Sequence, residues 1–162
     1  MQKSDGPFGG HSHPIVSPMK RLTVREDACI GCHLCEIWCV VAHSDSENPI
    51  DCFNLDETRP LPRVRVEENK PVSFPLQCRQ CSEPLCVFSC PSGAMSRGPD
   101  GVVQVDRERC QGCWTCLLVC PFGAVTRGDG FAVKCDLCPS RDIPACVEHC
   151  PNEAITVEEV DG

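Results

Sequence analysis

Residues 110–121 read Cys110-Gln111-Gly112-Cys113-Trp114-Thr115-Cys116-Leu117-Leu118-Val119-Cys120-Pro121. This spacing, C-x2-C-x2-C-x3-C-P, is typical of bacterial loops that hold a 4Fe–4S cluster. Three cysteines two residues apart allow one loop to wrap one cluster, and a glycine at the turn accepts a positive φ without a Cβ clash. The fourth cysteine of such a run serves a neighbouring cluster. One run therefore predicts at least one more.

Three further cysteine runs are present, and residues 110–121 form the third of four (run III). Run I has the same spacing without the final proline, run II has two residues added before its third cysteine, and in run IV that gap is seven residues long. The other runs are Cys29, Cys32, Cys35 and Cys39 (run I), Cys78, Cys81, Cys86 and Cys90 (run II), and Cys135, Cys138, Cys146 and Cys150 (run IV). Of 17 cysteines, only Cys52 is left over. The pattern predicts four 4Fe–4S clusters, and Cys52 is predicted to be a free thiol in a loop.

Composition indicates that something other than a large apolar core holds the fold together. Hydrophobic residues make up 41% of the 162 positions, a figure that includes all 17 cysteines, and aromatic residues only 5%. Disulfides are the alternative use of cysteine and are typical of secreted chains, but no secretory signal is visible in the first twenty residues. No apolar run approaches the roughly 18 residues that a membrane span needs. We therefore expect a cytoplasmic protein that uses its cysteines to bind metal.

Charge and motif content restrict the function classes. The formal net charge is −8, which disfavours a nucleic-acid binder, because such proteins need a basic surface. An acidic chain is instead attracted to a basic patch on a protein partner. The sequence has no phosphate-binding glycine loop and no nucleophile elbow. We expect no catalytic activity of its own.

An internal repeat organises the second half of the chain. Cys90, Cys120 and Cys150 are 30 residues apart, and each opens a similar phrase, as in Cys120-Pro121-Phe122-Gly123-Ala124-Val125-Thr126. Each unit is predicted to be a cysteine loop, a short helix ending near the fourth cysteine, a turn and a strand. β-branched or alternating segments at residues 22–24, 63–67, 101–105 and 130–133 are predicted to be strands. Residues 44–49 are polar and are predicted to be a loop.

The four runs, their order and the phrase Pro75-Leu76-Gln77-Cys78-Arg79-Gln80-Cys81-Ser82-Glu83-Pro84-Leu85-Cys86 resemble a known family. This family comprises the four-cluster polyferredoxin subunits of oxidoreductase complexes and is typified by the iron–sulfur subunit of dimethyl sulfoxide reductase. The resemblance covers residues 22–157. Val40 after Cys39, the short fourth gap and the absence of long insertions favour a compact soluble relative.

The resemblance implies an α+β fold of two bacterial-ferredoxin-like units, one inserted in the other and stapled by four 4Fe–4S clusters. Residues 19–47 and 130–162 would form the first unit and residues 48–129 the inserted unit. Residues 1–18 are rich in Gly, Pro, Ser and His, and this composition at a terminus predicts a flexible arm. In that family run I pairs with run IV, and run II with run III. The implied ligand sets are Cys29, Cys32, Cys35 and Cys150; Cys39, Cys135, Cys138 and Cys146; Cys78, Cys81, Cys86 and Cys120; and Cys90, Cys110, Cys113 and Cys116.

The resemblance also implies a function and partners. The chain would be an electron-transfer subunit that connects a catalytic subunit to a second redox partner, with no direct membrane span. The catalytic partner would be of the formate dehydrogenase, carbon monoxide dehydrogenase, hydrogenase or tungsten aldehyde oxidoreductase type. The alternative is a zinc-binding structural module, since C-x2-C pairs also occur in zinc sites. Run III argues against it, because its spacing does not suit one tetrahedral zinc.

Six further residues lie within or beside the runs. Trp38 and Trp114 are expected to pack against clusters and exclude water, which tunes their potentials. His33 and His149 adjoin cysteines, but every run already has four thiols, so neither is needed as a ligand. Glu36 and Glu148 are expected on solvated faces.

Overall fold

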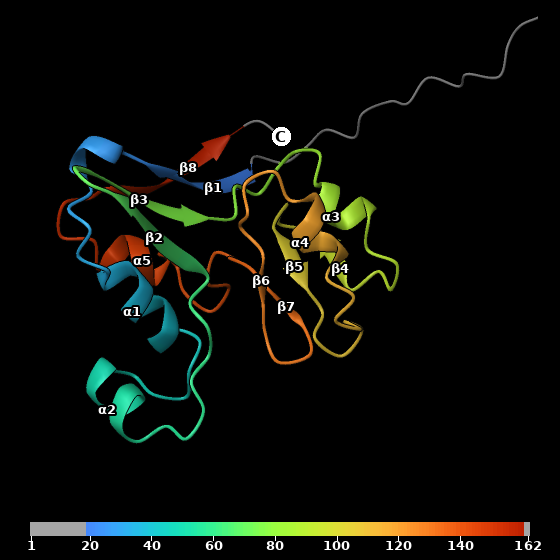
Figure 1. Cartoon of the computed structure of the whole chain (residues 1–162), viewed down its shortest axis with the longest axis horizontal. Helices are drawn as coiled ribbons and strands as arrows, with labels where there is room; N and C mark the ends of the chain where they lie inside the picture. Colours follow the sequence, from blue (N-terminus) through green and yellow to red (C-terminus); the bar gives the residue numbers. More distant parts are fainter. Residues whose placement is uncertain (1–18, 161–162) are drawn as a thin grey trace, which may run out of the picture.

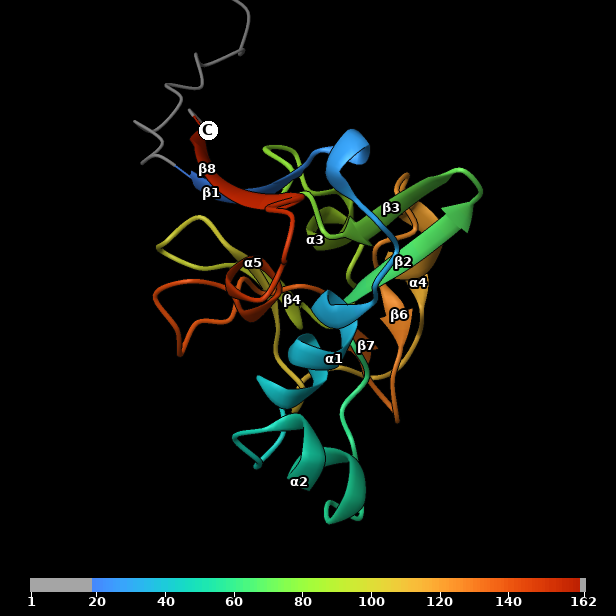
Figure 2. The same cartoon turned by 90° about the vertical axis from the view of Figure 1, so that its left-hand side faces the viewer.

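The computed structural model describes residues 19–160, which form an α+β protein built from short elements (Figures 1 and 2). The first half contains β1 (Met19–Val24), a 3-10 turn (Glu26–Ala28), α1 (Leu34–Val41), α2 (Pro49–Asn54), β2 (Val64–Asn69), β3 (Val72–Gln77) and α3 (Leu85–Phe88). The second half contains β4 (Met95–Arg97), β5 (Val103–Val105), α4 (Thr115–Val119), β6 (Thr126–Arg127), β7 (Ala132–Val133), α5 (Ala145–Glu148) and β8 (Ile155–Val160). The expected arm at residues 1–18 lies outside the described residues.

Four two-stranded antiparallel sheets organise these elements. In the first, β1 and β8 pair over six residues, from Met19 opposite Val160 to Val24 opposite Ile155. The two ends of the described chain therefore lie side by side, and all other elements come between them in the sequence. The other sheets are the β2–β3 hairpin and the shorter pairs β4–β5 and β6–β7.

The molecule has two lobes in Figure 1. One contains the β1–β8 pair, α1, α5 and the β2–β3 hairpin, with α2 extending from its lower end. The other contains α3 and α4 with the two short sheets. Helices α1 and α5 contact each other in the first lobe, as α3 and α4 do in the second. Each lobe thus has a pair of short helices in contact, together with small sheets, and every helix of these two pairs contains at least one cysteine.

Helix positions agree with the predicted repeat. Helix α1 contains the last cysteine of its run, and α3, α4 and α5 each end one or two residues before theirs, so the predicted short helices are confirmed. The predicted strands are confirmed too, although β7 is limited to Ala132–Val133. None of the helices within residues 19–160 has the length and apolarity needed to cross a bilayer.

The segment around Cys52 differs from its prediction. It forms α2 rather than a loop, because the Asn48 side chain accepts a hydrogen bond from the Asp51 N–H at 3.0 Å and Pro49 occupies the first turn. An Asn N-cap followed by Pro is a strong start signal for a helix. Cys52 is fully buried and packs with Val40 and Val41 of α1.

The interior contains few large apolar side chains. Its principal cluster has nine buried members, and five of them are cysteines: Cys35, Cys39, Cys78, Cys135 and Cys146. Leu22, Val64, Ala124 and Ile155 complete it. A core in which thiols outnumber hydrocarbon side chains depends on what those thiols bind.

Candidate metal centres

Four thiols from two distant segments line one cavity in the second lobe. They are Cys78, Cys81 and Cys86 of run II and Cys120, the last cysteine of run III. We call this group set II. Leu85, Phe122 and Val125 are among the apolar side chains that form the rest of the wall. An apolar cavity with four converging thiols suits a thiolate-bound 4Fe–4S cluster.

A second cavity, in the first lobe, has the same composition. Cys29, Cys32 and Cys35 of run I line it together with Cys150, the last cysteine of run IV. We call this group set I. Ile155 and Val66 contribute to its apolar wall. Burial raises the pKa of the Cys35 thiol to about 12, so this thiol needs a nearby cation before it can become a ligand.

Set IV consists of Cys39, Cys135, Cys138 and Cys146, and all four are buried. Burial raises the pKa of Cys146 far above its ordinary value, and the neighbouring thiols of Cys135, Cys39 and Cys138 raise it further. The Asp136 carboxylate accepts the Cys138 N–H at 3.2 Å and so shapes the loop between two of these cysteines.

Set III consists of Cys90, Cys110, Cys113 and Cys116. Cys116 is buried among Met95, Val103 and Val125, and Cys90 and Cys110 pack against the same cluster. Burial raises the pKa of Cys116 to about 11, and the thiols of Cys110 and Cys113 contribute. Cys113 is exposed.

The four sets adjoin one another in a row. Burial is the main cause of the raised thiol pKa in Cys146, Cys135 and Cys116, but each also responds to one thiol of a different set. These neighbours are Cys35 for Cys146, Cys78 for Cys135 and Cys86 for Cys116. The order is therefore set I, set IV, set II, set III.

Exposure varies along this row. All 17 cysteines lie in the described residues, and none is in a disulfide. Only Cys32 of set I and Cys113 of set III are exposed. The two ends of the row thus reach the surface, and set IV inside it does not.

The loops that present the thiols have matching conformations in runs I and III. Gly31 and Gly112 have φ of 66° and 63°, and His33 and Trp114, two residues later, have φ of 59° and 63°. A Cβ on Gly112 would lie 2.9 Å from the Gly130 carbonyl oxygen. The glycine is therefore required both for its φ and for the close approach of the backbone.

The donor sets fit the predicted cofactor. Each set offers four free thiols and no hard oxygen ligand, which suits iron–sulfur chemistry. Most buried thiols have raised pKa values, so the unloaded sites favour neutral thiols and the metal supplies the missing positive charge. Cys39 Sγ accepts the Arg63 N–H at 3.1 Å and Cys150 Sγ accepts the Ala154 N–H at 3.2 Å, the kind of bond that tunes cluster potentials.

An ion-pair network supports set IV. Asp136 pairs with Arg63 and with His43 Nε2 at 3.1 Å. Burial opposes the ionised carboxylate, but His43 and Arg63 hold the pKa of Asp136 well below its usual range. Burial likewise lowers the pKa of His43, yet its bonds to Asp136 and Cys39 raise it to about 9. His43, Asp136 and Cys138 also lie close enough to resemble a small metal site, but Cys138 belongs to set IV and Asp136 is already paired.

The two histidines beside cysteines have other partners. His33 Nδ1 contacts Glu36 at 2.9 Å and its Nε2 contacts Glu68 at 3.1 Å. His149 Nδ1 donates to the Ala145 carbonyl at 3.0 Å. This agrees with the expectation that neither histidine is needed as a ligand.

Both tryptophans make planar contacts beside cysteine loops. The Trp38 ring stacks on His149 with centroids 3.6 Å apart and an 18° interplanar angle. The Arg127 guanidinium lies 4.4 Å from the centroid of Trp114. Their shielding of clusters stays a prediction.

Three buried or partly buried polar residues were not foreseen. Glu36, expected on a solvated face, accepts the Val66 N–H at 2.5 Å and joins α1 to β2. Gln80 and Lys134 are 2% and 3% exposed, and both bond to the Cys135 carbonyl. Local sequence carried no signal for these contacts, because each depends on a distant segment.

A family comparison identifies the class of protein. Residues 70–160, more than half of the chain, match the model of the 4Fe–4S dicluster domain. The chain therefore belongs to the 4Fe–4S dicluster domain family. This confirms the predicted type of cofactor, while the number of clusters stays a prediction.

Individual relatives are iron–sulfur and electron transport proteins by name. The electron transport protein HydN of Escherichia coli K12 is 41% identical over 99 residues, which are 60% of this chain and 54% of HydN. An iron-sulfur protein of Rhodospirillum rubrum is 40% identical over 106 residues, 64% of this chain and 53% of that protein. A sulfite dehydrogenase subunit of Allochromatium vinosum is 34% identical over 113 residues, 59% of this chain and 46% of its own length. The chain thus spans about half the length of the curated relatives it matches.

A solved structure shares the fold. The active site complex BamBC of benzoyl coenzyme A reductase, in complex with 1,5-dienoyl-CoA, contains a chain that matches 91% of this one over 79% of its own length. The TM-score is 0.50 and the sequence identity 24%. At this identity the likeness concerns the fold alone.

Proposed function

We propose that this chain is an electron-transfer subunit that carries four 4Fe–4S clusters, one in each thiol set. A 4Fe–4S cluster supplies one-electron redox chemistry when it is bound. Sixteen of the 17 cysteines would act as ligands, and each set would take three from one run and one from another. The protein would conduct electrons and convert no substrate.

The observation that carries the proposal is exposure: of the 17 cysteines, all in the described residues, only Cys32 and Cys113 are exposed, and they belong to the two sets that would form the ends of the row. A shuttle that meets its partners through a single face needs one exposed centre. A row that is exposed at both ends suits electrons that enter at one end and leave at the other. The names of the electron transport relatives support the same reading.

The proposed architecture is one ferredoxin-like unit inserted in another. Residues 19–47 and 130–162 would form the first and residues 48–129 the second. The pairing of β1 with β8 supports this architecture, because it joins the two outer segments of the chain, which residues 48–129 separate in the sequence. The β2–β3 hairpin belongs by sequence to the inserted unit, yet it packs on α1 and β1, so it would link the two units.

The proposed partners are a catalytic oxidoreductase subunit and a second redox protein, in the cytoplasm. Candidates for the first are formate dehydrogenase, carbon monoxide dehydrogenase, hydrogenase and tungsten aldehyde oxidoreductase. The relative that is named as part of a sulfite dehydrogenase supports an oxidoreductase partner in general.

The test begins with anaerobic purification of the full chain. About 16 iron and about 16 sulfide per chain are expected for four cubane clusters. Alone, the protein should take electrons from a strong reductant and pass them to a dye without converting an organic or gaseous substrate. About eight iron would reduce the proposal to two clusters, and stoichiometric zinc would overturn it.

Pairing is tested separately through a ligand that would cross between runs. Cys90→Ala should remove the cluster of set III, although Cys90 lies in run II. Spectroscopic loss of set II with set III intact would show that each run binds its own cluster.

A further inference from the structure

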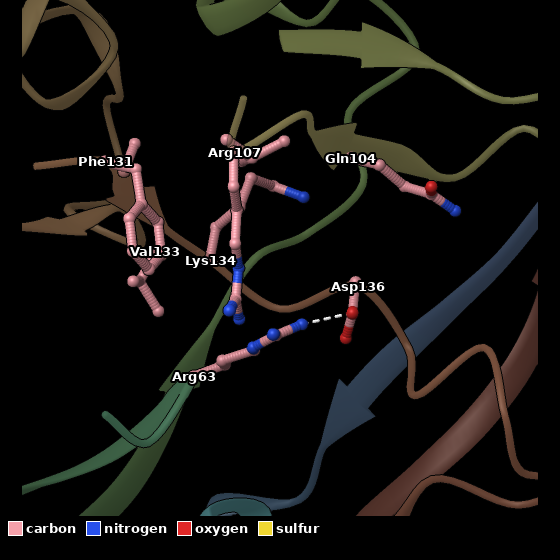
Figure 3. A pocket seen from close by; sticks show the side chains of 9 residues that line it. Arg63, Gln104, Arg107, Phe131, Val133, Lys134 and Asp136 are labelled. Carbon is pink, nitrogen blue, oxygen red and sulfur yellow. Dashed lines mark ion pairs between the residues drawn. The ribbon is translucent and has the colours of Figure 1, made fainter. Parts of the chain in front are cut away.

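Lys134 is a buried cation without an acidic partner. It is 3% exposed, and its Nζ donates to the carbonyl oxygens of Val103 and, at 2.7 Å, Cys135. No ion pair within residues 19–160 includes it. Asp136, two positions away, is paired with Arg63 instead. In Figure 3 the Lys134 side chain extends toward the strand of Gln104, away from that pair.

Leaving an ammonium buried in this way is costly. Two carbonyl dipoles satisfy hydrogen bonds, but they do not neutralise a full charge, and an unpaired buried charge is strongly destabilising. A methionine, which has a similar length, would fill the space at lower cost. The position of Lys134 therefore requires a negative group that the protein acquires when its metal sites are loaded.

Two thiol sets are near enough to be that negative group. Lys134 precedes Cys135 of set IV and bonds to its carbonyl. Lys134 Nζ also donates to the Val103 carbonyl, and Val103 lines the cavity of set II together with Cys86. Cys86 belongs to set II, so the ammonium reaches two sets that adjoin in the row. No other lysine in the described residues is buried.

We propose that Lys134 is the shared counter-ion of the clusters in sets II and IV and raises the reduction potential of both. It rests on the proposed function, because it requires clusters in both sets. Each reduction adds one electron and one negative charge beside the ammonium, and no bond forms or breaks. A nearby positive charge stabilises the reduced form, so electrons arrive more readily at the two inner positions, where they cross between lobes.

Gln80 provides a matched neutral control. It is 2% exposed, its Nε2 donates to the same Cys135 carbonyl at 3.0 Å, and its Oε1 accepts the Val103 N–H at 2.9 Å. Gln80 and Lys134 therefore connect the same two segments. The two side chains differ chiefly in charge, so a potential shift seen on replacing Lys134 but not on replacing Gln80 is due to the charge.

The experiment compares the anaerobic wild-type full chain with Lys134→Met, Lys134→Arg and Gln80→Met. Iron and sulfide content come first, followed by redox titration with dithionite, monitored by electron paramagnetic resonance. Lys134→Met should shift two of the cluster potentials to more negative values. Lys134→Arg, which keeps the charge, and Gln80→Met, which loses a matching hydrogen bond, should leave them near the wild-type values.

Every outcome decides the matter. Unchanged potentials in Lys134→Met, or an equal shift in Gln80→Met, would overturn the counter-ion role. If Lys134→Met loses iron while Lys134→Arg and Gln80→Met keep it, the charge is needed for loading, which supports the role. Iron loss in all three variants would show that Lys134 serves packing and would overturn the counter-ion role. A wild-type chain without clusters would instead overturn the proposed function itself.

Discussion

Sets IV and III offer the same four thiols in opposite surroundings. The cysteines of set IV are between 4% and 7% exposed, and an ion-pair network of His43, Asp136 and Arg63 lies against them. In set III only Cys116 is buried, and Cys113 is open to solvent. Identical ligand chemistry is thus placed once in the interior and once at the surface.

The surroundings change what each thiol does before a metal arrives. Burial raises the pKa of Cys135, Cys138 and Cys146 in set IV. In set III the hydroxyl and N–H of Thr115 lower the pKa of Cys113. Set IV therefore depends on the metal to become charged. In set III the pKa is lowered for Cys90 and Cys113, at an accessible end of the row, while Cys116 also depends on the metal.

The largest effect is expected from replacing one cysteine of set IV or, in a separate variant, one cysteine of set III. Cys146→Ser and Cys113→Ser should each lose about four of about 16 iron. Cys146→Ser should also lose more stability, since it places a hydroxyl in a buried site, which costs about 1–3 kcal/mol without a partner. Iron analysis and denaturant midpoints check this. Equal midpoints for the two variants would show that burial does not distinguish the sets.

Breaking an ion pair beside the cysteines should likewise cost more stability where the pair is largely buried than where it is exposed. Asp136→Asn leaves Arg63 buried without its counter-ion, and we expect a loss of about 3–5 kcal/mol in the free energy of unfolding. Glu148→Gln breaks the pair with Arg141. The side chain of Arg141 is 38% exposed and that of Glu148 is 47% exposed, so the loss in the free energy of unfolding should be less than about 1 kcal/mol. Chemical denaturation of the anaerobic protein measures both. Similar losses would contradict the comparison.

Cys52 separates burial from ligation. It is 0% exposed, like a member of set IV, but it packs in a separate hydrophobic cluster with Val40, Val41 and Trp38. Cys52→Ser should keep the full iron content and lose about 1–3 kcal/mol because of the buried hydroxyl. Cys52→Ala is the control and should lose less, since it adds no polar group. A loss of about four iron in Cys52→Ser would make this cysteine a ligand.

Sequence reasoning worked best where spacing along the chain determines geometry. The cysteine runs located the loops, the short helices and the cofactor type, because ligand spacing within a run is local. The β1–β8 pairing supports the inferred meeting of the two outer segments. Helix α2 was missed because the polar segment 44–49 outweighed the Asn48-Pro49 start signal, although Asn48 does cap the helix.

The supporting polar residues could not be predicted, because their partners are far away along the chain. Glu36 bonds to a backbone N–H 30 residues away, and Gln80 to a carbonyl 55 residues away. Lys134 resembles an ordinary surface lysine in sequence, yet it is buried. Burial of a polar side chain depends on tertiary packing, which neither periodicity nor composition reports.

The smallest expected effect concerns the hydroxyl beside the exposed cysteine. Thr115 Oγ1 lies 3.5 Å from Cys113 Sγ, and hydrogen bonds to cluster sulfurs raise the potential because they stabilise added negative charge. Thr115→Val keeps the shape and removes the donor, so the potential of set III should become slightly more negative, with stability within about 0.5 kcal/mol of wild type. Ser92→Ala, which removes the hydroxyl 3.6 Å from Cys90 Sγ, should act on the same cluster in the same direction. Redox titration checks both variants. Within residues 19–160 no side-chain hydroxyl bonds to a thiol of set IV, where Cys39 Sγ accepts the Arg63 N–H instead, so a shift in the potential of set IV would show that the variants act through the fold.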